Sequence, residues 1–152
     1  MARAKYQVLV IPYRKENDTV RYCIFSRSDA DTCFQFIAGG GEAEDGQPIV
    51  SAKREAFEEA GISPELPFIP LEATASIATE HFKNARQLWG EDCLVIPEYC
   101  FAVELTDGDI TISHEHTCFE WVDYDTAKQK LRFDSNKVAL WELDNKIRMC
   151  KF

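Results

Sequence analysis

Three glutamates within one helical turn constrain this chain more than any other feature. Residues 54–62 read Arg-Glu-Ala-Phe-Glu-Glu-Ala-Gly-Ile and follow a glycine run at 39–41. Helix residues three and four apart share a face, so Glu55, Glu58 and Glu59 would lie together. Like charges at this spacing destabilise a helix unless something positive lies among them, and a hard divalent cation is a natural candidate. The alternative is a solvated acidic helix face.

The same segment carries half of a known signature. The chain resembles the Nudix hydrolases, whose signature is G-x5-E-x7-R-E-U-x-E-E-x-G-U with U apolar, and residues 54–62 match its second half. The first half departs from it: counting back from Arg54 leads to Gly46 where the family has glutamate, although Gly40 keeps the glycine spacing. Three side chains lie near the place of the missing carboxylate: Glu44, Asp45 and Gln47.

Length and charge limit the kind of protein and of partner. We expect the 152 residues to form one domain, residues 1–152, with a single packed core. The net charge of −9 argues against duplex nucleic acid as a partner, because that binding depends on phosphate neutralisation by Lys and Arg. A small phosphorylated nucleotide is still compatible with this charge, since it would arrive as a metal complex.

Membrane and secretion signals are not evident in the sequence. No apolar stretch approaches the ~20 residues that span a bilayer, and no signal-peptide pattern precedes the first strand-like run. The six cysteines are scattered, with no C-x-x-C pair and no zinc-site spacing. A reduced, cytoplasmic location is therefore expected.

The order of predicted elements indicates the fold class. Strands are expected at 6–13, 20–26, 33–37, 72–79, 99–105 and 118–122, and helices at 48–60, 123–131 and 135–149. Pro48 suits a first helical turn and Gly61 a helix end, and Asp134-Ser135-Asn136 offers N-cap chemistry for the last helix. This order predicts an α+β or α/β/α sandwich. The resemblance implies the Nudix fold, a mixed sheet packed between helices.

The resemblance implies metal-ion chemistry for the helix at 48–60. It implies that Glu55 and Glu59 bind Mg²⁺ or Mn²⁺, with Glu58 as a further ligand or outer partner. Arg54 would orient a glutamate through a charge-assisted bond, and the alternative for Arg54 is an ordinary helix ion pair.

A further candidate lies outside this helix. The chain is similar to the dATP and dihydroneopterin triphosphate pyrophosphohydrolases, in which a Glu-His pair precedes a short strand with Trp and Asp, as Glu115-His116 precedes Trp121 and Asp123. The resemblance implies that Glu115 is a metal ligand or the general base, and the alternative is a surface residue in a polar loop. The flanking histidines would point away from Glu115 in an extended chain, so a joint His-Glu-His site is not expected.

Substrate-binding residues are predicted in three segments. An arginine at position 27 could grip a phosphate bidentately, although it could equally be a solvated strand end. The glycines would let the chain turn and approach metal and phosphate, or would form a tight loop. The stretch 80–89 mixes cations with aromatics. It could bind phosphates and a base, or it could be a variable surface loop with an aromatic tucked into the core. The predicted residues are Arg27, Gly39, Gly40, His81, Lys83 and Arg86.

The resemblance implies a metal-dependent pyrophosphohydrolase. It would cleave a dATP-like nucleoside triphosphate, or a related nucleoside diphosphate-X compound, to a monophosphate and pyrophosphate, with Arg54, Glu58 and Glu115 as catalytic residues. One alternative is another substrate, such as a diadenosine polyphosphate, an 8-oxo nucleotide or a nucleotide sugar. A second is a nucleotide-binding domain without turnover. The sequence leaves the natural substrate, the preferred metal and a homodimer open.

Overall fold

The computed structural model describes residues 3–27, 30–106, 110–112 and 116–152, with no description of the side chains of 27, 30–32 and 116–117. The elements in chain order are β1 (Arg3–Glu16), β2 (Thr19–Arg27), β3 (Ala30–Gln35), β4 (Ile37–Glu42), the 3-10 helix η1 (Ala43–Asp45), α1 (Pro48–Ala60), β5 (Phe68–Ala78), the 3-10 helix η2 (Thr79–His81), α2 (Ala85–Trp89), β6 (Val95–Glu104), β7 (His116–Val122), α3 (Tyr124–Lys130) and α4 (Asp134–Arg148).

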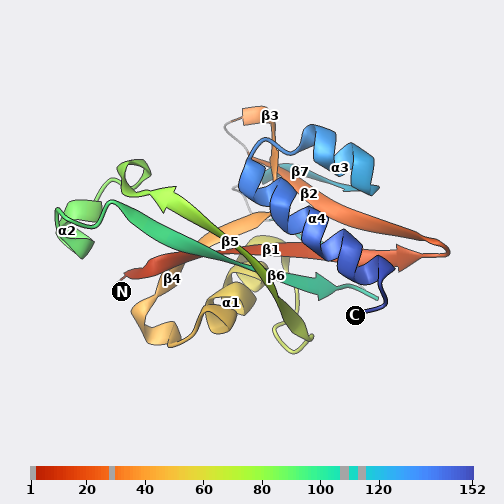
Figure 1. Ribbon diagram of the computed structural model, residues 1–152, viewed down its shortest axis with the longest axis horizontal. Helices are drawn as coiled ribbons and strands as arrows, with labels where there is room; N and C mark the ends of the chain where they lie inside the picture. Colours follow the sequence, from red (N-terminus) through yellow and green to blue (C-terminus); the bar gives the residue numbers. More distant parts are fainter. Residues whose placement is uncertain (1–2, 28–29, 107–109, 113–115) are drawn as a thin grey trace.

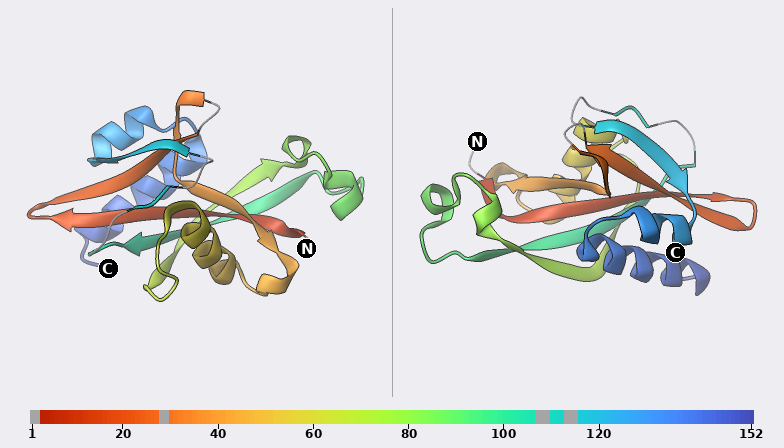
Figure 2. Two further views of the ribbon diagram at one scale, coloured as in Figure 1. Left: turned by 180° about the vertical axis from the view of Figure 1, so that it is seen from behind. Right: turned by 90° about the horizontal axis from the view of Figure 1, so that it is seen from above.

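The strands form one mixed sheet around β1. The hydrogen-bonded path runs β3-β2-β1-β6-β5, while β4 pairs with β1 and β7 pairs with β2. The β1–β6 pairing is parallel, and the other pairings are antiparallel. Helix α1 lies on one face of this sheet, and α3 and α4 lie on the other (Figures 1 and 2). The predicted α+β class, with a mixed sheet between helices, is confirmed.

Strand β1 divides the core into two layers. Leu9, Ile11 and Tyr13 belong to the cluster beneath α4, whereas Val8 and Val10 belong to the cluster beneath α1. Because β1 is buried on both faces, its sequence is a continuous apolar run instead of an alternating one. This run is the clearest strand signal in the sequence.

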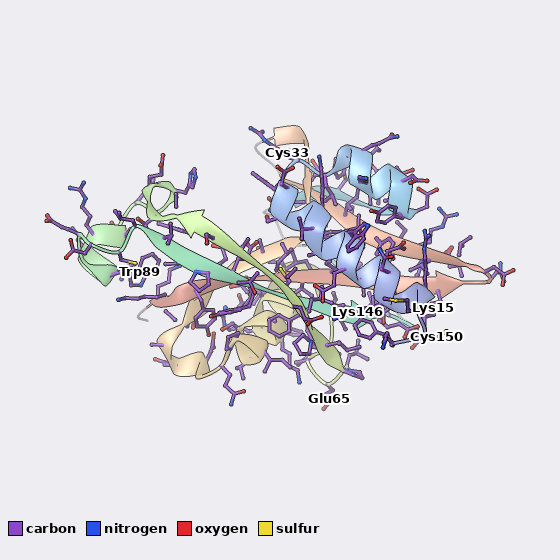
Figure 3. All side chains as sticks on the ribbon, in the orientation of Figure 1. Lys15, Cys33, Glu65, Trp89, Lys146 and Cys150 are labelled. Atoms are coloured by element: carbon purple, nitrogen blue, oxygen red, sulfur yellow. The ribbon has the colours of Figure 1, made fainter. Side chains whose placement is uncertain are left out.

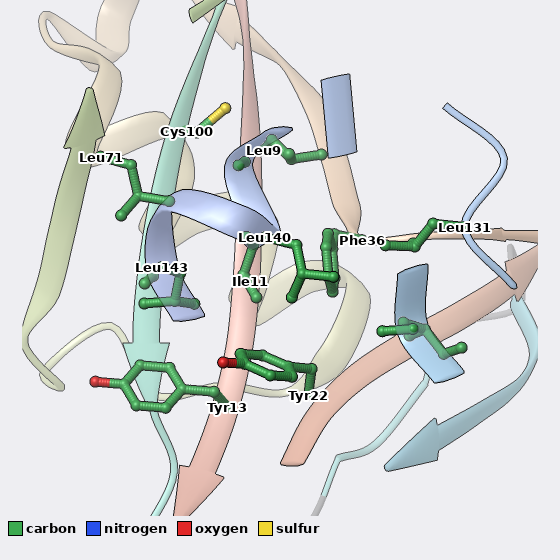
Figure 4. Close-up of a cluster of buried hydrophobic side chains, with 14 of the residues drawn as sticks. Leu9, Ile11, Tyr13, Tyr22, Phe36, Leu71, Cys100, Leu131, Leu140 and Leu143 are labelled. Atoms are coloured by element: carbon green, nitrogen blue, oxygen red, sulfur yellow. The ribbon is translucent and has the colours of Figure 1, made fainter. Parts of the chain in front are cut away.

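Helix α4 closes one of these layers. Leu140 and Leu143 are fully buried and reach down toward Ile11 on β1 (Figure 4). The helix begins at Asp134, and Phe133 occupies its N-cap position without a side-chain capping bond. The predicted N-cap chemistry is therefore wrong: Asn136 instead accepts a hydrogen bond from the backbone N–H of Phe36 at 2.8 Å.

Helix α1 has the predicted bounds. Pro48 is its first residue, and Gly61 ends it in the left-handed conformation with φ 68°. The N–H of Gly61 bonds to Phe57 O at 3.0 Å and that of Ile62 to Ala56 O at 3.2 Å, which closes the last turn. Apart from Glu59, the buried residues of α1 are small, namely Ser51, Ala52, Ala56 and Ala60, so the helix packs closely on the sheet.

Strands β5 and β6 extend beyond the helices and carry a small lobe. The lobe contains η2 and α2, and its core is Ala85, Trp89 and Ile96 (Figure 3). For residues 80–89 the sequence predicted a substrate-binding site or a surface loop, and no helix. None of the described helices is both long and apolar enough to cross a membrane.

Candidate functional site

A pocket of about 800 Å³ lies where β4, α1 and the β5–β6 lobe meet. Its walls come from the glycines of β4, the glutamates of α1, the start of β1, the lobe, and the first turn of α4. The residues that line it include Arg3, Gln7, Gly39, Gly40, Glu55, Glu59, His81, Phe82, Glu98, Phe133, Ser135 and Asn136.

The pocket contains two of the three clustered glutamates. Glu55 and Glu59 line it, and Glu59 is only 9% exposed. The Glu58 side chain is 55% exposed, and its Oε2 lies 3.5 Å from Arg54 Nη1. Glu58 is not among the residues that line the pocket. The helix thus presents Glu55 and Glu59 inward and Glu58 to solvent.

The electrostatics of Glu55 favour a cation. The pKa of Glu55 is raised to about 7, mainly by burial and also by the charges of Glu59 and Glu58, while Arg54 opposes the shift. A positive ion at the two carboxylates would relieve this repulsion. Among the described residues, no group of three or more His, Cys, Asp or Glu side chains is arranged to hold a metal ion. Two carboxylates suit Mg²⁺, which keeps several waters and often binds through one or two acidic side chains.

Arg54 connects this helix to the loop before it. Its Nη2 donates to Asp45 Oδ2 at 2.8 Å and to the carbonyl of Gly40 at 3.0 Å, and its Nη1 donates to Glu55 Oε1 at 2.9 Å. The Arg54 guanidinium lowers the pKa of Asp45 to about 2. The carboxylate raises the pKa of Arg54 in return. The arginine therefore links the loop, strand β4 and a pocket glutamate.

Asp45 takes the place that the sequence leaves open beside Arg54. Its Oδ2 also accepts from Ser51 Oγ at 2.6 Å and from the backbone N–H of Glu42 at 3.1 Å. The other two candidates, Glu44 and Gln47, are exposed. The carboxylate at Arg54 thus comes one residue before the family position.

The glycine run is not a turn. Gly39, Gly40 and Gly41 belong to strand β4, and positive φ angles among the described glycines occur at other positions. The prediction of a turn or tight loop is wrong here. A Cβ atom at these positions would displace neighbouring side chains: one on Gly39 would overlap the Glu55 carboxyl, and one on Gly40 would lie 2.5 Å from Arg3 Cζ. The backbone itself lies against the pocket side chains.

Sequence reasoning missed Arg3, which lines the pocket beside Gly40. Its Nη2 donates to Gln7 Oε1 at 3.2 Å, and its Cζ lies 4.6 Å from the centroid of the Phe82 ring. Trp89 Nε1 donates to the Arg3 carbonyl at 3.1 Å. Burial lowers the pKa of Arg3, and the charge of Glu55 opposes this shift. A lone arginine at the start of a strand offers no spacing pattern, so only the fold could bring it to notice.

The lobe contributes some of its predicted residues to the pocket. His81 lines it, together with Phe82. Lys83 and Arg86 are exposed and are not among its lining residues. Trp89 is buried, with its ring 5.7 Å from that of Phe82, as in the alternative of an aromatic tucked into the core.

The side chains of two predicted site residues, Arg27 and Glu115, are not described by the structure. The backbone of Arg27 pairs with that of His116 at the start of β7. The Arg27 side chain and the whole of Glu115 lie outside the described residues. The pairing brings the end of β2 beside the segment that follows Glu115.

Comparisons with known proteins identify the family. The chain matches the NUDIX domain over residues 4–141, and no curated protein matches it. A solved structure of a NUDIX hydrolase from Listeria monocytogenes is 39% identical with a TM-score of 0.84, covering 97% of each chain. The dihydroneopterin triphosphate pyrophosphohydrolase of E. coli is 21% identical with a TM-score of 0.73, covering 95% of this chain and 99% of that one. An Ap4A hydrolase of C. elegans is 17% identical with a TM-score of 0.69, covering 98% and 100%. The chain therefore belongs to the NUDIX family and is a hydrolase that acts on pyrophosphate bonds.

Proposed function

We propose that this chain is a metal-dependent nucleotide pyrophosphohydrolase that cleaves a dATP-like nucleoside triphosphate to a monophosphate and pyrophosphate. The observation that carries the proposal is the pair Glu55 and Glu59 in one pocket with Arg3. Carboxylates suit a divalent ion, and a guanidinium suits phosphate oxygens. The E. coli dihydroneopterin triphosphate enzyme shares the fold, which supports a triphosphate substrate.

Glu55 and Glu59 would hold Mg²⁺ or Mn²⁺, with Glu115 as a further ligand. Glu58, whose side chain faces solvent, would have to turn toward the ion to bind it. When bound, the ion would neutralise charge on the phosphate oxygens and activate water. Arg54 keeps Glu55 in place through their 2.9 Å hydrogen bond. We propose Glu58 or Glu115 as the general base, and for Glu115 the support is its place in the sequence alone.

The remaining residues would bind the substrate. Arg3 and Gly40 lie together on the pocket wall, where a guanidinium and backbone groups would meet the phosphates. His81 lines the same pocket from the lobe. For Arg27, Lys83 and Arg86 we propose phosphate contacts made from its rim. Gly39 brings the backbone of β4 against the Glu55 carboxyl.

The setting of the reaction is part of the proposal. We propose that residues 1–152 act as one domain in the cytoplasm. All six cysteines are free, which fits a reducing compartment.

A nucleotide-binding domain without turnover is the second candidate. The feature that favours it is the altered first half of the signature, where Gly46 stands at the position of the family's glutamate. Hydrolysis of another substrate is the third possibility, because an Ap4A hydrolase shares the fold at 17% identity.

A substrate panel separates these functions. Purified protein with Mg²⁺ or Mn²⁺ is incubated with dATP, dihydroneopterin triphosphate, diadenosine tetraphosphate, 8-oxo-dGTP and ADP-ribose, and the products are resolved by chromatography. We expect pyrophosphate and a monophosphate from the triphosphates. Saturable nucleotide binding with no product from any compound would favour the binding domain and contradict the proposed enzyme.

Variants then test the carboxylates. Glu59→Gln is expected to lower kcat by at least ~100-fold while leaving the unfolding midpoint near that of the parent. The matched control is Glu65→Gln, an exposed glutamate in the loop after α1 (Figure 3). Near-parental activity of Glu59→Gln would remove this residue from the proposed metal site. Glu115→Gln is expected to be similarly harmful, and a mild effect would leave Glu58 as the proposed base.

A further inference from the structure

A second carboxylate site lies in the same pocket, across the sheet from the glycines. Gly40 on β4, Gln7 on β1 and Glu98 on β6 are paired in register on three adjacent strands. Neighbouring strands are ~4.8 Å apart, so the backbones of Glu98 and Gly40 lie about 10 Å apart across the sheet. Both Gln7 and Glu98 line the pocket. The pocket therefore has a carboxylate besides those on α1.

Glu98 is held in one orientation by a short chain of donors. Arg3 Nη2 donates to Gln7 Oε1 at 3.2 Å, which fixes the amide, and Gln7 Nε2 then donates to Glu98 Oε2 at 3.2 Å. Burial raises the pKa of Glu98, while its interactions with Gln7 and Ser135 lower it. The chain of donors leads from the proposed phosphate-binding arginine to this carboxylate.

One carboxylate oxygen of Glu98 makes no hydrogen bond to the described residues. The residue is only 3% exposed, and its buried Oε1 has no hydrogen-bond partner among the described residues. A buried acceptor without a donor is costly, and such atoms are rare in folded proteins. Because Glu98 is one of the residues that line the pocket, a ligand bound beside it could supply the missing donor.

The surroundings of Glu98 suit a flat heterocycle. Phe133 lines the pocket and is 44% exposed, so its ring is accessible for stacking. The Asn136 amide oxygen is already used by the Phe36 backbone N–H, and its Nδ2 donates to Ser135 Oγ at 3.3 Å. By hydrogen-bond geometry Glu98 Oε1 has no donor among the described residues, although the nearby Ser135 side chain helps to lower the pKa of Glu98.

We infer that Glu98 selects the substrate's base by accepting a hydrogen bond from an exocyclic amino group. This inference rests on the proposed function, because it assigns the base end of the same pocket. It names the substrate class as nucleotides or related triphosphates whose heterocycle carries an amino group. Gln7 is the positioning residue that directs the carboxylate toward that group.

The test compares two substrates that differ only in the amino group, dATP and the triphosphate of 2′-deoxypurine riboside. For the parent, kcat/KM is expected to be at least ~10-fold higher for dATP, with the difference mainly in KM. In Glu98→Gln, the Gln7 amide keeps a carbonyl to bond, and the new NH₂ faces the substrate amino group. The preference for dATP should then disappear. The triphosphate of 2′-deoxypurine riboside, which lacks the amino group, should be cleaved at close to the parental rate. The control is Glu104→Gln, on the same strand but outside the pocket.

The outcomes separate this inference from the proposed function. An equal preference in the parent and in Glu98→Gln overturns the inference even if both cleave dATP well. A parent that does not distinguish the two nucleotides overturns it without any variant. If neither nucleotide is hydrolysed, the proposed function fails, and calorimetric titration of both with Mg²⁺ still measures the binding preference. If Glu98→Gln unfolds, Gln7→Leu replaces it, and an unchanged preference there contradicts the positioning by Gln7.

Discussion

Asp45 Oδ2 lies 2.8 Å from Arg54 Nη2 and joins the loop before α1 to the middle of that helix. The family pattern has its glutamate one residue later, where this chain has Gly46. That glycine has φ 80°, a conformation that residues with a side chain adopt only with strain. The loop therefore accommodates glycine at 46 and supplies its carboxylate from 45. The altered half of the signature thus still provides a carboxylate that pairs with Arg54.

Asp45→Asn should destabilise the protein and lower its activity. It replaces a charged acceptor that holds Arg54, Ser51 and the Glu42 backbone. We expect a loss of about 1–3 kcal/mol in the free energy of unfolding, measured by urea titration. Glu44→Gln changes the neighbouring, exposed carboxylate and should leave the unfolding midpoint unchanged. Equal midpoints for the two variants would show that the Asp45 network does not stabilise the loop.

The stabilisation by Asp45 should depend on pH. The pKa of Asp45 falls from an ordinary 3.8 to about 2 in the folded protein. A group with a lowered folded pKa contributes fully above its unfolded pKa, and that contribution is lost as pH falls toward the folded value. The stability difference between parent and Asp45→Asn should be constant from pH 7 to 5 and shrink between about pH 4 and 2. A difference that persists undiminished at pH 2 would contradict this assignment.

Local patterns predicted the parts of the fold in which one segment determines its own structure. Helix α1 has the expected bounds, because Pro48 and Gly61 mark its two ends. Strand β1 was found from its apolar run, although it extends further at both ends. Strand β4 was missed because its glycines have low strand propensity. Only the packing of Glu55, Arg3 and the Tyr6 ring against them explains their presence in a strand.

The candidate site was predictable where the signature is dense and not where residues meet from distant strands. Glu55 and Glu59 followed from helical spacing, and they line the pocket. Arg3, Gln7 and Glu98 come from the start of β1 and from β6, which are adjacent only because these strands pair in parallel. Such a pairing brings together residues about ninety positions apart, as in the Gln7–Glu98 hydrogen bond. A local sequence pattern cannot predict a contact over this separation.

Glu142 is expected to stabilise an irregularity in β5. Its two oxygens accept the backbone N–H groups of Glu72 and Ala73 at 2.6 and 2.7 Å, where the register with β6 shifts between Pro70 and Thr74. Glu142→Leu would leave both donors without this partner and should lower the free energy of unfolding by about 2–4 kcal/mol. The control is Glu72→Gln, which removes only an exposed ion pair with Lys146 and should cost less than about 1 kcal/mol. Similar losses in both variants would argue against the backbone bonds.

Gly39→Ala should be destabilising because the added methyl group would collide with the Glu55 side chain. The added Cβ would overlap the Glu55 carboxyl, which cannot retreat without breaking its bond to Arg54. We expect a loss of about 1–3 kcal/mol in urea unfolding. In a Glu55→Ala background these nearest atoms are removed, so the same substitution should cost much less, and the double-mutant cycle should show a coupling of at least ~1 kcal/mol.

Gly46→Ala provides the comparison for that cycle. No atom lies within 4 Å of a Cβ at Gly46, and its strain comes from φ 80° alone. Its destabilisation should therefore be the same with Glu55 or Ala at position 55, because the strain is in the backbone. If Gly39→Ala is equally costly in both backgrounds, the Glu55 carboxyl does not explain why position 39 is glycine. If only Gly39 shows coupling, the close approach of β4 to this carboxylate is the reason.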